Sequence, residues 1–244
     1  KENPLQQPPA LTAPEVALEK VPQQPGEKAA IARYNQLLAA AEPSLALQAR
    51  LELAEMHGRR QNPEGALEVL AGALDQAPSP ELLERIRLRL AAALLDVKNA
   101  KEALQHASAV LANPASPLAG EARYLTGEAC LQLKDYPKAV ETLLPFRDKG
   151  ELHQIADVSD RAMLRLGQAY ALLGQWDPSR QALEALVNRY PNSPYVYEAR
   201  YGIGWAWQNA KNFDQAIAAY QEVVKRTAAE PAARAQLQIG LCRL

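Results

Sequence analysis

The stretch of sequence that decides the fold is residues 160–191, DRAMLRLGQAYALLGQWDPSRQALEALVNRYP. It carries two small residues, Gly167 and Ser179, which lie 12 positions apart on either side of the sequence GQWDPS. A small residue on each of two helices lets their axes approach closely, whereas a larger side chain would hold them apart or strain the core. The stretch therefore predicts two helices joined by a tight turn.

The same arrangement recurs along the chain. A first series of small residues follows intervals of 37, 36, 40, 37 and 36 residues, and each of its first five members is followed 12 residues later by a member of a second series. An offset that stays constant while the period varies identifies an internal repeat. The first series is Ala54, Ala91, Gly127, Gly167, Gly204 and Gly240, and the second is Ala66, Ala103, Ala139, Ser179 and Ala216.

The composition favours an all-α fold. Apolar residues make up 48% of the chain, alanine and leucine dominate them, and the commonest polar residues are also good helix formers. The formal net charge is −1 with acids and bases interspersed, so no basic run indicates nucleic acid or an acidic membrane. No apolar run reaches the roughly 18 residues that a membrane span needs. We expect no nucleic-acid partner and no direct membrane insertion within these residues.

Two further features mark the repeat boundaries. An aromatic residue lies between the two small residues in the later repeats, at Tyr136, Trp176 and Phe213, and we expect it to cover the turn. Serine precedes proline at 79–80, 116–117 and 193–194. This dipeptide predicts a capping hydroxyl followed by proline at the first helical position.

Each repeat has two small residues 12 apart, and the later repeats also have an aromatic residue between them; a proline such as Pro191 closes a repeat. Together these features resemble the tetratricopeptide repeat family, whose period is about 34 residues. The resemblance is strongest over 160–191 and 197–227 and covers roughly residues 47–244. It implies an all-α, right-handed α-α superhelix, that is, a solenoid of antiparallel helix pairs. The five repeats are expected at about 47–80, 84–115, 120–150, 160–193 and 197–230, within 47–232.

The two ends of the chain differ from the repeats. Residues 1–26 contain six prolines and much glutamine, so we expect an extended linker there, or alternatively a proline-rich ligand for another domain. Residues 27–46 are expected to form an N-terminal capping helix. Residues 233–244 are expected to be the first helix of a truncated sixth repeat, because no second helix follows them, and we therefore expect the chain to be a fragment.

No motif in the chain predicts catalysis. Gly202-Ile203-Gly204 lacks the third glycine and the preceding strand of a dinucleotide-binding loop, and no HExxH, GxSxG or Walker sequence occurs. Cys130 and Cys242 are 112 residues apart, and the histidines are not paired at metal-ligand spacing. We therefore expect a protein that is not an enzyme and that has no cofactor and no metal.

The family resemblance implies a protein-binding groove lined by the first helix of each pair. Aromatic residues bury a large area at low entropic cost, so Tyr124, Tyr201 and Trp205 are the expected binding hot spots. The alternative is that Tyr201 and Trp205 pack against the adjoining repeat. If they line the groove, replacing both with alanine should leave the melting temperature nearly unchanged. The candidate groove residues are Tyr124, Glu128, Arg161, Leu164, Gln168, Tyr201, Trp205 and Gln208.

Two stretches of sequence are similar to tetratricopeptide domains of bacterial envelope proteins, namely RYPNSPYVYEARYGIG (189–204) and SPLAGEARYLTGEA (116–129). Such domains occur in the Tol–Pal-associated periplasmic cell-division coordinator and in outer-membrane assembly lipoproteins. The similarity implies a non-catalytic scaffold in the periplasm or at the outer membrane that binds a protein or peptide in its groove. The alternatives are a cytoplasmic scaffold, a structural subunit of a larger assembly that uses its convex and terminal faces, and the non-catalytic arm of a larger enzyme.

Overall fold

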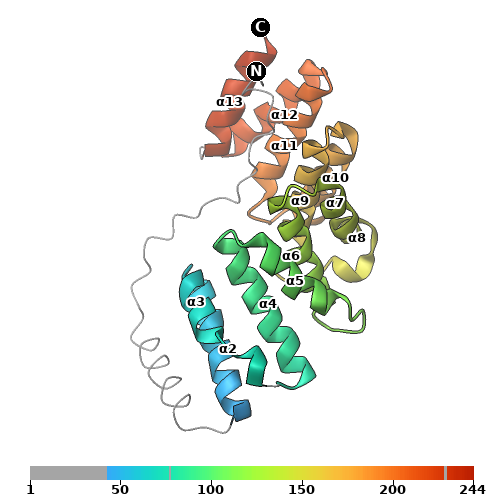
Figure 1. The fold of residues 1–244 in the computed structure, drawn as a ribbon. Helices are drawn as coiled ribbons and strands as arrows, with labels where there is room; N and C mark the ends of the chain where they lie inside the picture. The colour runs from blue at the N-terminus through green and yellow to red at the C-terminus, as the bar shows by residue number, and fades with distance from the viewer. Residues whose placement is uncertain (1–42, 77, 228–229) are drawn as a thin grey trace. The chain divides into compact units, whose positions relative to one another are not determined.

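The computed structural model describes residues 43–76, 78–227 and 230–244 (Figure 1). Every regular element in these ranges is a helix, and they contain no strand, which confirms the all-α fold class. The predicted linker over 1–26 and most of the predicted capping helix over 27–46 lie outside the described residues. None of the described helices is both long and apolar enough to cross a membrane.

The chain divides into two compact units between Leu133 and Lys134. In the N-terminal unit, α2, α4 and α6 contact one another in sequence and form one layer, while α3 and α5 pack against them as a second layer. The elements of this unit are α2 (Pro43–Arg59), α3 (Pro63–Leu70), the 3₁₀ turn η2 (Leu74–Gln76), α4 (Pro80–Asp96), α5 (Ala100–Leu111) and α6 (Ala119–Gln132).

The C-terminal unit is built in the same way. Helices α9, α11 and α13 form the first layer, and α7, α10 and α12 form the second. The elements are α7 (Tyr136–Leu143), α8 (Pro145–Asp148), η3 (Gly150–Leu152), α9 (Ser159–Leu172), α10 (Trp176–Arg189), α11 (Val196–Asn209), α12 (Phe213–Arg226) and α13 (Glu230–Cys242).

The two series of small residues mark the places where paired helices approach most closely. The hydroxyl of Ser179 on α10 donates a hydrogen bond of 2.7 Å to the carbonyl oxygen of Gly167 on α9. A Cβ atom on Gly167 would lie only 2.5 Å from Cδ2 of Leu183. A Cβ contact that short is essentially never observed, so a larger residue at this position would force the Leu183 side chain to shift.

The turn between paired helices is also repeated. Between α4 and α5 the chain passes through Val97, Lys98 and Asn99, and Lys98 has a left-handed φ of 65°. The N–H groups of Lys98 and Asn99 donate to the carbonyls of Leu95 and Leu94, which is the Schellman pattern of helix termination. The residues at the same place in the other turns of this kind also have positive φ, namely Gln61 (54°), Lys134 (63°), Gly174 (70°) and Lys211 (62°).

The predicted serine caps are correct at one site and wrong at two. Ser79 caps α4, with its Oγ accepting from the N–H of Leu82 at 3.4 Å. Helices α6 and α11, however, begin two residues after Pro117 and Pro194, so neither proline is at the first helical position. The reason is that the preceding serine hydroxyls close turns of their own.

Both of these serines also tie a loop to the preceding first-layer helix. Ser116 accepts from the N–H of Leu118 at 3.1 Å and donates to Glu84 of α4 at 2.5 Å. Ser193 accepts from the N–H of Tyr195 at 3.1 Å and donates to Asp160 of α9 at 2.6 Å. A serine–carboxylate hydrogen bond of the same kind therefore occurs once in each unit.

The aromatic residues expected to cover the turns are only partly buried. Tyr136 and Trp176 are half-buried, but Phe213 remains 46% exposed, so it does not cover its turn. The turn before Phe213 is already closed by its own backbone, because the N–H of Asn212 donates to the carbonyl of Trp207 at 2.9 Å. This turn is therefore held by its own backbone hydrogen bond, without the Phe213 ring packing over it.

Candidate functional site

The predicted groove residues lie on first-layer helices, but in two separate units. Tyr124 and Glu128 belong to α6 in the N-terminal unit, where the Tyr124 hydroxyl donates to Glu128 at 3.3 Å. The other predicted groove residues belong to α9 and α11 in the C-terminal unit. Six of the eight candidates thus lie on two first-layer helices that contact each other. We call the surface of α9 and α11 that carries them, together with the adjoining surface of α13, the C-terminal groove face.

The eight candidates differ sharply in exposure. Tyr124, Leu164, Tyr201 and Trp205 are buried, with 5%, 1%, 2% and 6% of their surface exposed. Glu128, Arg161, Gln168 and Gln208 are half-buried. The two sets occupy the same helices. The four buried residues are aromatic or aliphatic and the four half-buried residues are charged or carry an amide, so a partner could reach chiefly the polar set.

Repeat register explains the burial of Tyr201. It lies three residues before the small residue of its repeat, and Leu51, Leu88 and Leu164 hold that position in α2, α4 and α9. These three are at most 1% exposed, and each lies on a helix that contacts the next first-layer helix of its unit. In α13 the corresponding residue, Leu237, is 63% exposed. The position therefore packs neighbouring first-layer helices together.

The neighbours of Tyr201 show this packing directly. The guanidinium carbon of Arg234 on α13 lies 4.6 Å from the centre of the Tyr201 ring. On the other side, the ring of Tyr220 on α12 lies at 5.4 Å with the two planes tilted by 49°. Burial raises the pKa of the Tyr201 hydroxyl. The structure thus favours the packing alternative for Tyr201 over exposure in the groove.

A buried ion pair joins α11 to α13 beside this ring. Nη2 of Arg234 lies 2.8 and 2.7 Å from the two carboxylate oxygens of Glu198, which is only 4% exposed. Burial raises the pKa of Glu198, and the charge and hydrogen bonds of Arg234 oppose that shift. Because acid and base compensate each other, this part of the C-terminal groove face carries no net charge.

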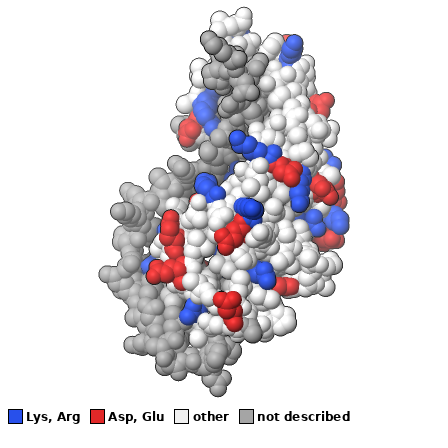
Figure 2. All heavy atoms as spheres, in the orientation of Figure 1, with Lys and Arg blue, Asp and Glu red and all other residues white. Residues whose placement is uncertain are grey.

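Sequence reasoning missed this pair, although the repeat contains a signal for it. The position six residues before the small residue alternates in charge, through Arg85, Glu121, Arg161, Glu198 and Arg234. In the N-terminal unit Arg85 pairs with Glu55 at 3.4 Å, and Arg89 pairs with Glu121. Figure 2 shows acidic and basic side chains interspersed over one face of the molecule.

Two amides on the C-terminal groove face have their oxygen atoms already engaged. Gln168 Oε1 accepts from Arg165 Nη1 at 3.1 Å, and Gln208 Oε1 accepts from the Tyr220 hydroxyl at 2.8 Å. These bonds fix the orientation of each amide, so that its Nε2 is a donor for which no acceptor is found among the described residues.

A third side-chain donor belongs to Trp205 of α11. Trp205 is at the position in α11 that Gln168 holds in α9, and Gln208 follows it by less than one helical turn. The indole Nε1 of Trp205 is buried and has no hydrogen-bond partner within the described part of the chain. On α13, the buried Gln238 Oε1 also has none, while its side chain hydrogen-bonds with Tyr201. The amide donors of Gln168 and Gln208 thus belong to the α9 and α11 part of the face, whereas the indole donor is enclosed within the helix layer.

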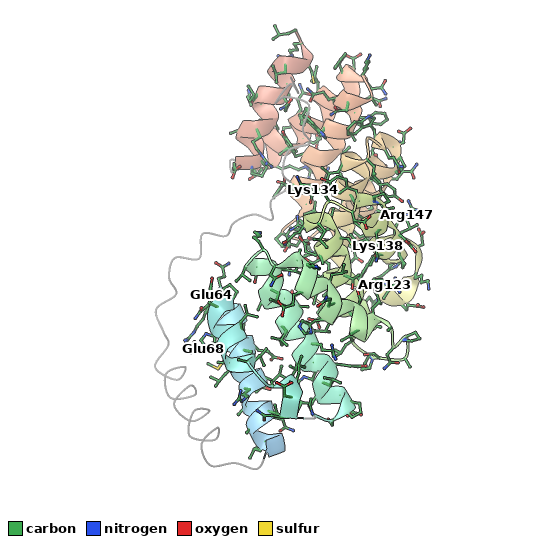
Figure 3. The ribbon with its side chains drawn as sticks, viewed as in Figure 1. Glu64, Glu68, Arg123, Lys134, Lys138 and Arg147 are labelled. Atoms are coloured by element: carbon green, nitrogen blue, oxygen red, sulfur yellow. The ribbon has the colours of Figure 1, made fainter. Side chains whose placement is uncertain are left out.

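Charged residues of the second-layer helices point into solvent, among them Glu64 and Glu68 of α3 and Lys138 of α7 (Figure 3). Within the described ranges, no group of three or more histidine, cysteine, aspartate and glutamate side chains could hold a metal ion. Cys130 is buried and Cys242 half-buried, and neither forms a disulfide.

Several solved structures resemble this chain in fold. MamA matches with 18% identity and a TM-score of 0.58, over 73% of this chain and 90% of MamA. MamA from residue 41 onward, from Desulfovibrio magneticus RS-1, matches with 20% identity and a TM-score of 0.60, over 78% of this chain and 96% of that one. The apo form of RapI matches with 12% identity and a TM-score of 0.73, over 89% of this chain and 65% of RapI. At these identities the likeness concerns the fold alone.

The comparison with curated proteins found no match. Family models described as tetratricopeptide repeat match residues 28–79, 88–144, 161–193 and 198–226, which together make up more than half of the chain. These matches agree with the paired helices, the close-packed small residues and the repeated turns. The chain belongs to the tetratricopeptide repeat family.

Proposed function

We propose that the protein is a non-catalytic scaffold of a bacterial cell envelope that binds a protein or peptide along its first-layer helices. The tetratricopeptide fold is consistent with a protein-interaction scaffold. The observation that carries the proposal is the pair of amides on the C-terminal groove face, Gln168 and Gln208. Internal bonds hold both with their donors available, and such preorganisation lowers the entropic cost of binding.

The burial of the apolar groove positions supports the same role. Leu164, Tyr201 and Trp205 pack the first-layer helices together, so the half-buried polar residues sit on a rigid support. A partner then contacts a preformed surface and does not need to order it first. This arrangement favours recognition through hydrogen bonds over recognition through a large exposed aromatic patch.

Site-specific photocross-linking tests the groove. A photoreactive amino acid at the half-buried Leu172, about one turn after Gln168 on α9, should capture a partner from envelope extract in the full chain. The same group at the exposed Gln181 on the second-layer helix α10 should not. Gln168→Leu should reduce capture at position 172. Equal capture at 172 and 181, or capture unaffected by Gln168→Leu, would contradict groove binding. Fractionation of the native cells tests the location, and recovery with the cytoplasm would refute the envelope assignment.

A second candidate role, as a structural subunit of a larger assembly, is supported by α13. Leu237 and Leu241 follow one another at helical spacing on α13 and are 63% and 37% exposed. An exposed apolar surface of this kind suits a permanent contact with another subunit. Replacing Leu237 and Leu241 with serine should leave groove binding intact and should disrupt the assembly if this second role applies.

A further inference from the structure

The charged residues in the middle of the C-terminal groove face are mostly positive. Two positions of the first-layer helices, two and six residues before the small residue, carry charges that pair between neighbouring helices, as in Arg89 with Glu121. At these positions α2, α4 and α6 balance two acids with two bases. On α9, α11 and α13 three bases face one acid, namely Arg161, Arg165, Arg234 and Glu198.

The acids of these three helices are shared or engaged elsewhere. Arg234 binds both carboxylate oxygens of Glu198, at 2.8 and 2.7 Å, and Glu230 in the first turn of α13 lies 3.9 Å from the same arginine. Burial raises the pKa of Glu198, and the nearby charges of Arg234 and Arg165 oppose that shift. Asp160, in the first turn of α9, accepts a hydrogen bond from a loop serine. The surplus of positive charge therefore belongs to α9.

The neutral polar groups of the face also suit a partner that supplies acceptors. Arg165 Nη1 donates to Gln168 Oε1 at 3.1 Å, and the Tyr220 hydroxyl donates to Gln208 Oε1 at 2.8 Å. Each amide therefore presents its Nε2 donor, and that of Gln168 belongs to an amide held by an arginine. A carboxylate is the acceptor that best matches arginine, because the charge and the hydrogen-bond geometry both fit.

We propose that the polypeptide segment bound along α9 and α11 is acidic, with its carboxylates meeting Arg161 and Arg165. Further oxygen atoms of the segment accept from the amides of Gln168 and Gln208. The inference rests on the proposed groove function and names the chemistry of the partner. Complementary charge of this kind speeds association and excludes basic segments.

Nucleic acid is the other polymer that carries many negative charges, but the face suits it less well. Proteins hold single strands by stacking the bases on accessible aromatic rings. The aromatic residues at the groove positions of α11, Tyr201 and Trp205, are only 2% and 6% exposed. The face therefore favours an acidic polypeptide over a nucleic acid strand.

Fluorescence anisotropy of the full chain with two short labelled peptides tests the charge preference. One peptide alternates glutamate with alanine, and the other has glutamine in place of every glutamate. The glutamate peptide should bind at least about tenfold more tightly at low ionic strength, and its affinity should fall as salt screens the charges. Equal affinity of the two peptides, or tighter binding of a single-stranded DNA, would overturn the proposal.

Variants that remove a charge locate the binding. Arg165→Gln should weaken binding of the glutamate peptide about fivefold to tenfold, and adding Arg161→Gln should weaken it further. Arg165→Lys keeps the charge and should retain most of the affinity. Arg226→Gln is the matched control, because it removes the same charge from the exposed end of the second-layer helix α12 and should leave the affinity unchanged. An equal loss from Arg165→Gln and Arg226→Gln would refute binding on this face.

A further variant leaves both arginines in place. Gln168→Glu adds a carboxylate that repels the glutamate peptide, so it should lower the affinity more than Gln168→Leu, which removes only a donor. Melting curves of each variant exclude unfolding as the cause. An affinity of Gln168→Glu equal to that of the native chain would overturn the proposal.

The two proposals can fail independently. If cross-linking at position 172 captures a partner equally from the native chain and from Arg165→Gln, and the two peptides bind alike, the scaffold function stands and the acidic partner is refuted. If the glutamate peptide binds and follows the variants but no partner is captured, the charge preference stands and the scaffold function is refuted. If both hold, the glutamate peptide should compete with the captured partner.

Discussion

A Cβ atom placed on Gly204 would lie 2.6 Å from Cε1 of Tyr220, so α11 and α12 meet at a point where only glycine fits. The ring cannot withdraw, because Tyr220 is fully buried and its hydroxyl is bonded to Gln208 at 2.8 Å. The same contact that joins the two helices therefore also holds the Gln208 amide of the groove face. Packing and the candidate binding site share this residue pair.

Gly204→Ala should destabilise the protein by about 1–3 kcal/mol, since the added methyl group overpacks a rigid contact. Gly240 provides the matched control, because it holds the same repeat position in α13 and a Cβ atom there would have no neighbour within 4 Å. Gly240→Ala should stabilise by roughly 0.5–1 kcal/mol through its higher helix propensity. Chemical denaturation measures both, and a shift of the same sign in the two variants would contradict this account.

Tyr201→Ala combined with Trp205→Ala should lower the stability by several kcal/mol, because each substitution removes a large buried ring. This outcome agrees with the alternative in which both rings pack against the adjoining repeat, and it is the opposite of the nearly unchanged melting temperature expected if they line the groove. Tyr197→Ala is the control, since Tyr197 is on the same helix but 37% exposed. Thermal unfolding followed by circular dichroism decides the matter, and equal melting temperatures for the native chain and the double variant would place the rings outside the core.

Lys211→Gly should raise the stability by about 0.5–1 kcal/mol. Lys211 adopts a φ of 62°, where a residue with a Cβ atom is strained and glycine is not. The reverse change is Gly174→Ala at the equivalent turn, with φ of 70°, and it should destabilise by a similar amount. Melting temperatures of the two variants should move in opposite directions, and movement in one direction would show that turn strain is not the cause.

The stability contributed by Glu198 should fall as pH rises. Its folded pKa is raised above the ordinary value of 4.5, chiefly by burial, so the folded protein binds the proton more tightly than the unfolded chain does. The contribution is then largest below pH 4.5 and is lost as pH rises through the folded pKa. The unfolding free energy of the native chain minus that of Glu198→Gln should therefore decrease from pH 4 to 7.

Glu222 supplies a control of opposite sign for this experiment. Hydrogen bonds from Lys225 and Arg226 lower its pKa, so its contribution is present above the ordinary pKa and is lost as pH falls. The difference between the native chain and Glu222→Gln should therefore increase with pH. A flat or rising difference for Glu198→Gln would mean that Arg234, and not burial, governs the Glu198 carboxylate.

The repeat was predictable from the sequence because its determinants are local and recur. Gly167 with Ser179 and Gly204 with Ala216 keep one offset, and the tight approach they permit needs no knowledge of the rest of the chain. The start of α4 at Ser79-Pro80 was equally predictable from the sequence, since capping involves neighbours along the chain. The later starts of α6 and α11 were not, because Ser116 and Ser193 bond to carboxylates on another helix.

The sequence by itself thus determined the all-α class, the helix pairs and which of the candidate residues lie on the first-layer helices. Only the tertiary structure decided which of them a partner could reach. Tyr201 and Leu237 hold the same repeat position, yet one is 2% and the other 63% exposed. Accessibility depends on whether another first-layer helix follows in space, and this is a property of the stacked helices rather than of the residue or its sequence neighbours.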